Sequence, residues 1–315
     1  MEGLSKSNMS HISVVIPVLN EATLIDELVK RVKTNIEKIT EDFELIIVDD
    51  GSDDETWKKV KHYAREDIRI KGIKFSRNFG HHYAITSGLN SSSGDWVVVM
   101  DGDLQDRPEV IPSLYQKALE GFEVVFVSRV NRPEKMYYKI LQKIFYRLLN
   151  LLSGLNFDSS QANFSIIKRN VVQAFNDFPE NSRFYVSTIK WLGFKSSSIT
   201  ADHGMRFSGR PSYTLSKRFK LASDIILAFS NKPLRFIVYL GLYSSIASII
   251  FAFFMTFNKN NLFVTPDEGS IFLSILVLIG GCFFLVLGIL GIYIGNIYTQ
   301  VKNRPLYVVS EKINL

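Results

Sequence analysis

Apolar and polar positions alternate along the first two-thirds of the chain in a way that predicts strands and helices in turn. Short apolar runs rich in β-branched residues predict strands. These runs are 13–18, 43–48, 70–76, 96–100 and 123–130. Apolar residues at helical spacing predict helices over 23–39, 54–66 and 108–120, with a further one between 76 and 96. This alternation is typical of an α/β domain with a mostly parallel sheet covered on both faces.

Two long apolar runs follow this pattern. Residues 236–257 and 270–300 contain no charged residue, and each exceeds the roughly 20 apolar residues that a membrane-spanning helix needs. A buried core helix is the alternative, but core helices of this length usually show a polar face. We therefore predict two transmembrane helices.

Basic residues lie at the outer ends of these two runs. They are Lys217, Arg218, Lys220, Lys232, Arg235, Lys302 and Arg304. The connecting loop, 258–269, holds one lysine against two acids. The polar residues 1–10 have no apolar segment typical of a signal peptide. By the positive-inside rule, we expect a multi-pass protein of the inner cell membrane with the α/β domain and both termini in the cytoplasm.

Net charge and composition narrow the classes of binding partner that we expect. The net charge is +6, but residues 206–235 hold seven basic residues and one acid beside a predicted span, so a lipid headgroup or lipid phosphate is expected rather than nucleic acid. Apolar residues recur at helical spacing over 215–229 and favour an interfacial amphipathic helix, with an ordinary packed helix as the alternative. A further helix is predicted over 137–152. The single cysteine, Cys282, excludes an intrachain disulfide and a cysteine-based metal site.

Polar residues cluster where the predicted strands end, which is where ligands bind in parallel sheets. The pair Asp101 and Asp103, with one glycine between them, can hold a divalent cation that also binds diphosphate oxygens. Taken alone, such a pair of acids more often belongs to a solvent-exposed loop. No glycine fingerprint follows the first strand, so a nicotinamide cofactor is not expected. Two adjacent histidines, His81 and His82, are poor evidence for zinc, and packing beneath the site explains them as well as a general base does.

Four segments together resemble a known family. They are ISVVIPVLNE at 12–21, VDDGSDD at 48–54, RNFGHH at 77–82 and MDGDLQDRPE at 100–109. In this order they resemble family 2 glycosyltransferases with the GT-A fold. More narrowly, they resemble polyprenyl-phosphate hexosyltransferases of the dolichyl-phosphate mannose synthase and bactoprenol glucosyltransferase type. The resemblance extends from about residue 12 to 309 and includes NKPLR at 231–235 and GNIYTQVKNRP at 295–305.

The resemblance implies three groups of site residues. The nucleotide-sugar group is Pro17, Glu21, Asp49, Asp50, Asp101 and Arg206. The metal group, for Mg²⁺ or Mn²⁺, is Asp103, Asp101 and Gln105. In the acceptor-phosphate group the resemblance implies Arg129, and Arg132 and Lys139 are further candidates for the same task. Arginine suits phosphate because its planar side chain can donate two hydrogen bonds at once. Asp101, Asp103 and Arg129 are expected to be catalytic. Solvated surface charges are the alternative for Glu21 and for the acceptor-phosphate group.

The chain departs from the family pattern at three positions. Asn163 stands where many relatives have an acid that has been suggested as a base, and Ser165 stands where they have an arginine. A family lysine near the diphosphate corresponds to Ser212, for which Arg210 is a substitute. A phosphate acceptor has a second pKa of about 6 and attacks without a base, so catalysis is still expected. These three positions bear on which sugar the donor carries.

We expect a cytoplasmic GT-A domain over 1–205, a juxtamembrane amphipathic segment over 206–234, and a two-helix transmembrane region with a short cytoplasmic tail over 235–315. The expected activity is inverting transfer of a hexose from a nucleotide sugar, UDP-glucose first, to polyprenyl (undecaprenyl) phosphate. The alternatives are a glycan acceptor and a non-catalytic scaffold, and the retained acids argue against the scaffold. Relatives suggest a homo-oligomer.

Overall fold

The computed structural model describes residues 10–130, 161–181, 183–202 and 268–315, and isolated positions between them (147, 232, 234, 237–239, 241–243, 246 and 250). The chain divides into two compact units. The first comprises Met1–Asn150, Leu155–Ser216 and Pro305–Leu315, and the second comprises Leu151–Gly154 and Lys217–Arg304.

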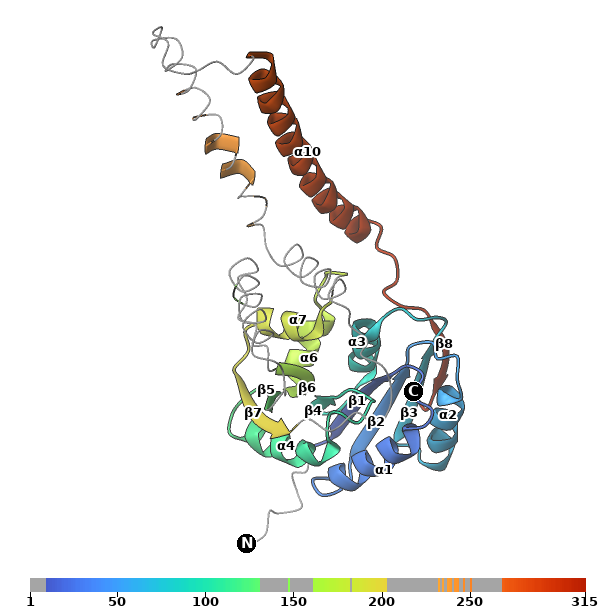
Figure 1. Cartoon of the computed structure of the whole chain (residues 1–315). Helices are drawn as coiled ribbons and strands as arrows, with labels where there is room; N and C mark the ends of the chain where they lie inside the picture. Colours follow the sequence, from blue (N-terminus) through green and yellow to red (C-terminus); the bar gives the residue numbers. More distant parts are fainter. Residues whose placement is uncertain are drawn as a thin grey trace. The chain divides into compact units, whose positions relative to one another are not determined.

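The described strands of the first unit form one sheet in the order β7-β5-β6-β4-β1-β2-β3-β8 (Figure 1). Their bounds are Ile12–Val18 (β1), Phe43–Asp49 (β2), Ile70–Phe75 (β3), Trp96–Val99 (β4), Val124–Val130 (β5), Gln161–Lys168 (β6), Ser196–Asp202 (β7) and Val309–Ile313 (β8). Strands β4, β1, β2 and β3 run parallel, as do β5 and β7. Strands β6 and β8 are antiparallel to their neighbours. The predicted mostly parallel α/β sheet is therefore confirmed.

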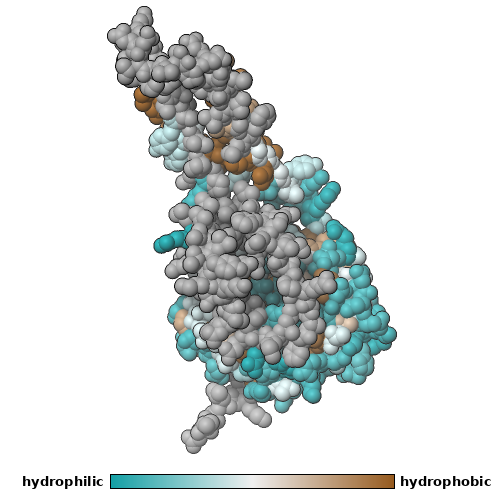
Figure 2. All heavy atoms as spheres, in the orientation of Figure 1, coloured by the Kyte–Doolittle hydropathy of each residue, from teal (hydrophilic) through white to brown (hydrophobic). Residues whose placement is uncertain are grey.

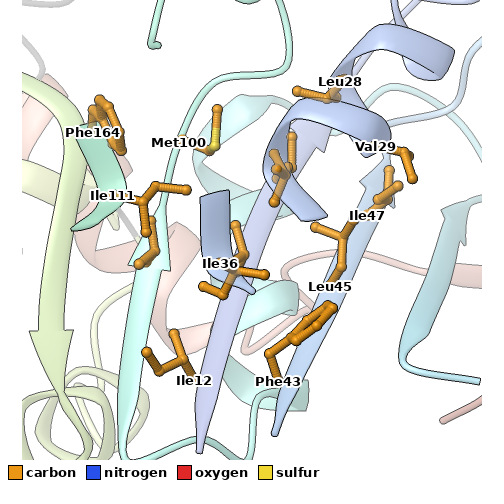
Figure 3. Packing of buried hydrophobic residues seen from close by; sticks show 14 of the residues in the cluster. Ile12, Leu28, Val29, Ile36, Phe43, Leu45, Ile47, Met100, Ile111 and Phe164 are labelled. Atoms are coloured by element: carbon orange, nitrogen blue, oxygen red, sulfur yellow. The ribbon is translucent and has the colours of Figure 1, made fainter. Parts of the chain in front are cut away.

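Helices cover both faces of this sheet, as the sequence predicts. Helices α1 (Ile25–Ile36), α2 (Thr56–Glu66) and α4 (Ile111–Leu119) pack with one buried cluster. Helices α3 (His81–Ser91), α6 (Arg169–Asn176) and α7 (Tyr185–Trp191) pack with the other. Alternate residues of β1 separate onto the two faces, since Val14 belongs to the first cluster and Val15 to the second. Figure 3 shows Ile12, Leu45 and Ile36 packed within the first cluster.

Two predicted helices are shorter than expected. The helix predicted over 23–39 spans Ile25–Ile36, and a turn follows it in which the N–H groups of Ile39 and Thr40 both donate to the Ile36 carbonyl. The helix predicted over 108–120 begins with a short 3₁₀ turn, η2 (Pro108–Val110), before α4. Proline lacks a backbone N–H and is favoured at such helix starts.

The C-terminal residues differ from the predicted domain plan, which placed 305–315 in a tail beyond the membrane region. They belong to the first unit, where β8 pairs antiparallel with β3. The Asn314 side chain donates to the carbonyls of Ala64 and Ile70 at 2.6 and 2.8 Å. The indole of Trp57 donates to Glu311 at 2.7 Å. The physical reason is that β3 would otherwise leave a row of unpaired backbone groups at the sheet edge.

Helix α10 (Glu268–Val301) covers the second apolar run and belongs to the second unit. It exposes large apolar side chains, including Phe272, Leu276, Ile279, Phe283, Leu287, Ile292, Ile294 and Ile297. In Figure 2 hydrophobic residues are exposed on the described part of this unit, whereas the described face of the first unit is mostly hydrophilic. Counting only the residues that the structure describes, no helix is long and apolar enough to cross a membrane. The first apolar run and the helices predicted over 137–152 and 215–229 lie outside the described residues, apart from isolated positions.

Candidate functional site

The loops after β1, β2 and β4 meet at one edge of the sheet. The backbone N–H of Asp50, after β2, donates to the carbonyl of Val18 at the end of β1 at 3.0 Å. A Cβ atom on Gly102, after β4, would lie 2.7 Å from the Val18 side chain and 3.1 Å from the Pro17 carbonyl. Parallel neighbours end at the same edge, so the predicted residues at the ends of these strands and on the loops after them come together there. They are Pro17, Glu21, Asp49, Asp50, Asp101, Asp103 and Gln105.

Hydrogen bonds fix the loop after β1 against the start of α2. Asn20 has a positive φ of 56°. Its N–H donates to the Ser52 hydroxyl at 2.9 Å, and its side-chain oxygen accepts the Asp53 N–H at 3.0 Å. The N–H of Glu21 donates to the hydroxyl of Thr56 at 2.9 Å. The backbone of Glu21, a residue of the predicted nucleotide-sugar group, is therefore held in place, and its side chain is partly exposed.

Asp49 and Asp50 are both buried and both organise backbone. Asp49 accepts the N–H of Ser52 at 2.8 Å. Asp50 accepts the N–H groups of Phe79 and Gly80, at 2.8 and 3.0 Å, and so ties the loop after β3 to the loop after β2. Burial raises the pKa of Asp50, and these two N–H groups oppose that rise. Contact of Asp50 with the nucleotide sugar stays a prediction, and the structure shows its role in fixing the loop.

The Asp101–Asp103 loop is folded tightly. The Asp101 N–H donates to the buried Asp106 carboxylate at 3.1 Å, and the Gln105 N–H donates to Asp103 at 3.0 Å. Leu104 lies between the two acids and Gln105 with a positive φ of 59°, and its side chain is buried. This conformation is costly for leucine, so its burial helps to hold the loop. Asp101, Asp103 and Gln105 each remain partly exposed.

The chemistry of these three side chains fits a divalent cation. Carboxylate and amide oxygens are the hard ligands that Mg²⁺ and Mn²⁺ take in proteins. Among the described residues, no group of three histidine, cysteine, aspartate or glutamate side chains is placed to hold a metal ion. Two carboxylates and one amide suit a cation whose other ligands are water and diphosphate oxygens.

His81 is a site residue that the sequence analysis did not assign. Its Nε2 atom lies 3.2 Å from an Asp101 oxygen and 3.0 Å from the Asn163 amide. Burial lowers the pKa of His81, but the carboxylates of Asp101, Asp50 and Asp106 outweigh burial and raise it overall. Two features of the sequence could have identified His81 as a site residue. They are its place after the loop that follows β3 and the family motif that contains it.

His82 is a packing residue, as the sequence analysis allowed. Its ring lies edge-on to Phe184, with centroids 5.5 Å apart. Burial and the neighbouring His81 lower the pKa of His82 to about 4. An imidazole with this pKa is neutral near pH 7, which is compatible with its place in the interior.

Two of the three departures from the family pattern fall on described residues. Asn163 lies near the start of β6 and contacts His81. Ser165 is buried, and its hydroxyl bonds to the Asn163 carbonyl and the Tyr185 hydroxyl, both at 2.8 Å. Ser165 is therefore part of the core beneath the site. Ser212 and Arg210 lie outside the described residues.

The structure does not test the basic side chains that are predicted to bind phosphate. Arg129 lies in β5 opposite Ala201 of β7, but its side chain is outside the described set. Arg132, Lys139 and Arg206 lie outside the described residues altogether. Their roles stay predictions.

Three comparisons with known proteins agree. The family model described as glycosyl transferase family 2 matches residues 13–175. The uncharacterized glycosyltransferase YkcC of Bacillus subtilis (strain 168) is 35% identical over 304 residues, which are 96% of this chain and 94% of that protein. The undecaprenyl-phosphate 4-deoxy-4-formamido-L-arabinose transferase of Yersinia pestis (strain Pestoides F) is 32% identical, covering 96% of this chain and 93% of the relative.

A solved structure shows a similar fold at low sequence identity. Glucosyl-3-phosphoglycerate synthase from Mycobacterium tuberculosis, in complex with Mn²⁺ and UDP-glucose, is 19% identical with a TM-score of 0.50. The match covers 69% of this chain and 77% of that one. The predicted GT-A-like fold is confirmed, and the match of the family model to 163 residues (13–175) of the 315 settles the assignment. The chain is a glycosyltransferase and belongs to glycosyl transferase family 2.

Proposed function

We propose that this glycosyltransferase moves a hexose from a nucleotide sugar to a polyprenyl phosphate at the cytoplasmic face of a membrane. The observation that carries the proposal is the similarity to a relative named for undecaprenyl phosphate, which extends over 96% of the chain and hence beyond the α/β unit. UDP-glucose is the first donor to test, because the mycobacterial synthase of similar fold was solved with it.

The proposed reaction is a single displacement. An oxygen of the acceptor phosphate attacks C1 of the sugar, and the bond from C1 to the diphosphate oxygen breaks, so an α-linked donor gives a β-linked product. With a second pKa of about 6, the acceptor is mostly dianionic at neutral pH and has no proton to lose to a base. Asn163, which stands where many relatives have an acid, is compatible with this chemistry.

The carboxyl edge of the sheet supplies the donor site in this proposal. Glu21 and Pro17 border the nucleoside, and Asp50 faces its base. Asp103 and Asp101, with Gln105, would hold Mg²⁺ or Mn²⁺, and Arg206 would bind the diphosphate. When bound, the cation would neutralise charge on the departing nucleoside diphosphate. The described loop supports this because it orders Asp103 and Gln105 through one hydrogen bond of 3.0 Å.

A polyprenyl acceptor requires that the site lie at the level of the lipid headgroups. We propose that residues 236–257 and 270–300 span the membrane, with 206–234 on its surface and both termini in the cytoplasm. The apolar side chains exposed along α10 support this, because they would be costly in water and favourable in lipid. Arg129, Arg132 and Lys139 would then bind the acceptor phosphate.

The test compares acceptors. The chain in detergent, with a labelled nucleotide sugar and Mn²⁺, receives either undecaprenyl phosphate or a mixture of water-soluble oligosaccharides. Label that partitions into organic solvent only with undecaprenyl phosphate is the expected result. Label on the oligosaccharides alone would replace the proposal with a glycan acceptor.

A further inference from the structure

Strand β8 pairs with β3 in a register that places the start of β8 at the site edge of the sheet. Val309, the first residue of β8, pairs with Phe75, the last residue of β3. The N–H of Ser76, directly after β3, donates to the carbonyl of Val308 at 2.9 Å. Because β3 runs parallel to β2, its carboxyl end lies at the edge where the loops of the candidate site meet.

Aromatic side chains extend this contact from the C-terminal segment into the domain. The ring of Tyr307 stacks on that of Phe75, with centroids 4.8 Å apart. The ring of Phe75 in turn meets that of Phe79 edge-on, with centroids 5.8 Å apart. The amide of Asn90, on α3, lies 3.1 Å from the Tyr307 hydroxyl. The C-terminal segment therefore contacts both elements that flank the loop of residues 76–80.

The loop of residues 76–80 is packed against the turn that carries Asp50. The carboxylate of Asp50 accepts two backbone N–H groups of this loop, at 2.8 and 3.0 Å. A Cβ atom on Gly51 would lie 2.4 Å from the carbonyl carbon of Arg77, so the two backbones are already in close contact. A shift of the loop would therefore take hydrogen bonds from Asp50, a residue of the predicted nucleotide-sugar group.

The other end of β8 is held at a distance from this loop. The Asn314 side chain donates to the carbonyls of Ala64 and Ile70, at 2.6 and 2.8 Å. Ile70 begins β3 and Phe75 ends it, so the two ends of the strand lie about 16 Å apart. One short C-terminal segment thus makes one set of contacts beside the site loop and another at the opposite end of β3.

We propose that Tyr307 is a positioning residue for the donor site. Its ring, together with the Val308 carbonyl, holds the loop of residues 76–80 where Asp50 accepts its N–H groups. The segment that follows α10 in the chain then completes the frame of the nucleotide-binding side of the site. The inference rests on the proposed function, because it takes Asp50 to belong to the donor side. A nucleotide that requires the ordered loop binds more weakly in proportion to the fraction of molecules that have lost it.

The experiment compares three variants with the wild type, as full chains in detergent. Tyr307→Ala removes the stacked ring, Tyr307→Phe keeps it, and Asn314→Ala releases the far end of β8. Each is measured for the dissociation constant of UDP with Mn²⁺, for the KM of undecaprenyl phosphate with UDP-glucose as donor, and for the melting temperature. Binding is measured well below the lowest melting temperature of the set, so that unfolded chains do not contribute.

The two ends of β8 should give different results. Tyr307→Ala should weaken UDP binding about fivefold, within the range that one aromatic pair contributes, and should leave the KM for undecaprenyl phosphate unchanged. Tyr307→Phe should stay within about twofold of the wild type, because the ring is kept. Asn314→Ala should lower the melting temperature and leave UDP binding unchanged. A purely structural role of Tyr307 would give both alanine variants the same profile.

Several results would overturn the proposal. They are unchanged UDP binding in Tyr307→Ala, an equal loss of UDP binding in Asn314→Ala, and an equal loss in Tyr307→Phe. A wild type that binds UDP with Mn²⁺ but makes no polyprenyl product would remove the proposed function alone, and the variants would then be judged on the UDP dissociation constants. A wild type that binds neither UDP nor any other nucleoside diphosphate would overturn both.

Discussion

The ring of Tyr307 stacks on the ring of Phe75, with centroids 4.8 Å apart and planes 13° apart. Phe75 ends β3, and Tyr307 follows α10 near the end of the chain. The Asn90 amide of α3 lies 3.1 Å from the Tyr307 hydroxyl, and the Ser76 N–H donates to the Val308 carbonyl at 2.9 Å. The C-terminal segment therefore braces β3 and α3, which flank the loop that Asp50 fixes.

Tyr307→Ala should lower the free energy of unfolding by about 1–2 kcal/mol, because a partly buried aromatic contact is lost. Tyr307→Phe keeps the ring and should cost less than about 1 kcal/mol, the worth of one exposed hydrogen bond. Urea unfolding of the full chain in detergent measures both. Val308→Ala, at an exposed side chain of the same segment, is the control. Equal stability of Tyr307→Ala and the wild type would contradict a bracing role.

Gly51 and Gly121 make a matched pair for testing the loop after β2. Both have positive φ, 78° and 94°. A Cβ on Gly51 would lie 2.4 Å from the Arg77 carbonyl carbon, whereas one on Gly121 would meet only the Lys195 ammonium at 3.8 Å. Alanine at either position should cost about 1–2 kcal/mol in backbone strain. Gly51→Ala should lose more stability than Gly121→Ala and also lose transferase activity, because the loop of 77–80 must move. Similar effects of the two would show that this close approach is unimportant.

Glu44 gives a stability prediction with a defined pH window. It is buried, and burial raises its pKa, but hydrogen bonds from Lys71, Ser13 and Ser93 lower the pKa to about 2. Its ordinary pKa is 4.5. A lowered carboxylate pKa contributes stability that is present above 4.5 and is lost as the pH falls toward 2, here about 3 kcal/mol in all.

Glu44→Gln should therefore flatten the fall in melting temperature between pH 4.5 and pH 2, the two ends of the shift in the Glu44 pKa. Thermal unfolding across this range measures the slope. Glu66→Gln, at an exposed position on α2, is the control and should keep the wild-type slope. A wild-type slope in Glu44→Gln would contradict the assignment.

Topology can be tested with the single cysteine. Cys282→Ser gives a chain without cysteine, into which one cysteine is placed at Asn260 or at Ser310. In intact cells, an impermeant thiol reagent should label Asn260→Cys and should label Ser310→Cys only after lysis, because the loop between the spans lies outside. The reverse pattern would contradict the proposed orientation.

Strands β1 to β5 were predictable because each is a local apolar run, and acids follow β1, β2 and β4. Strands β6, β7 and β8 were not predicted. The sequences of β7 (SSSITAD) and β8 (VSEKI) contain few apolar residues, and the pairing partners of both strands lie far along the chain. The same holds for the site. The acids of the Asp101 loop follow from a pattern, but the contact of His81 with Asn163 exists only because β6 lies beside β4.

The most direct test of the account measures lipid-linked product from a panel of labelled nucleotide sugars and undecaprenyl phosphate, with Mg²⁺ or Mn²⁺, for the wild type and for Asp103→Ala. The account predicts organic-extractable label from one donor, removed by EDTA and reduced at least about a hundredfold in the variant, the range expected when a charge-stabilising group is lost. No lipid product from any donor with a folded wild type, or full activity in Asp103→Ala, would contradict it.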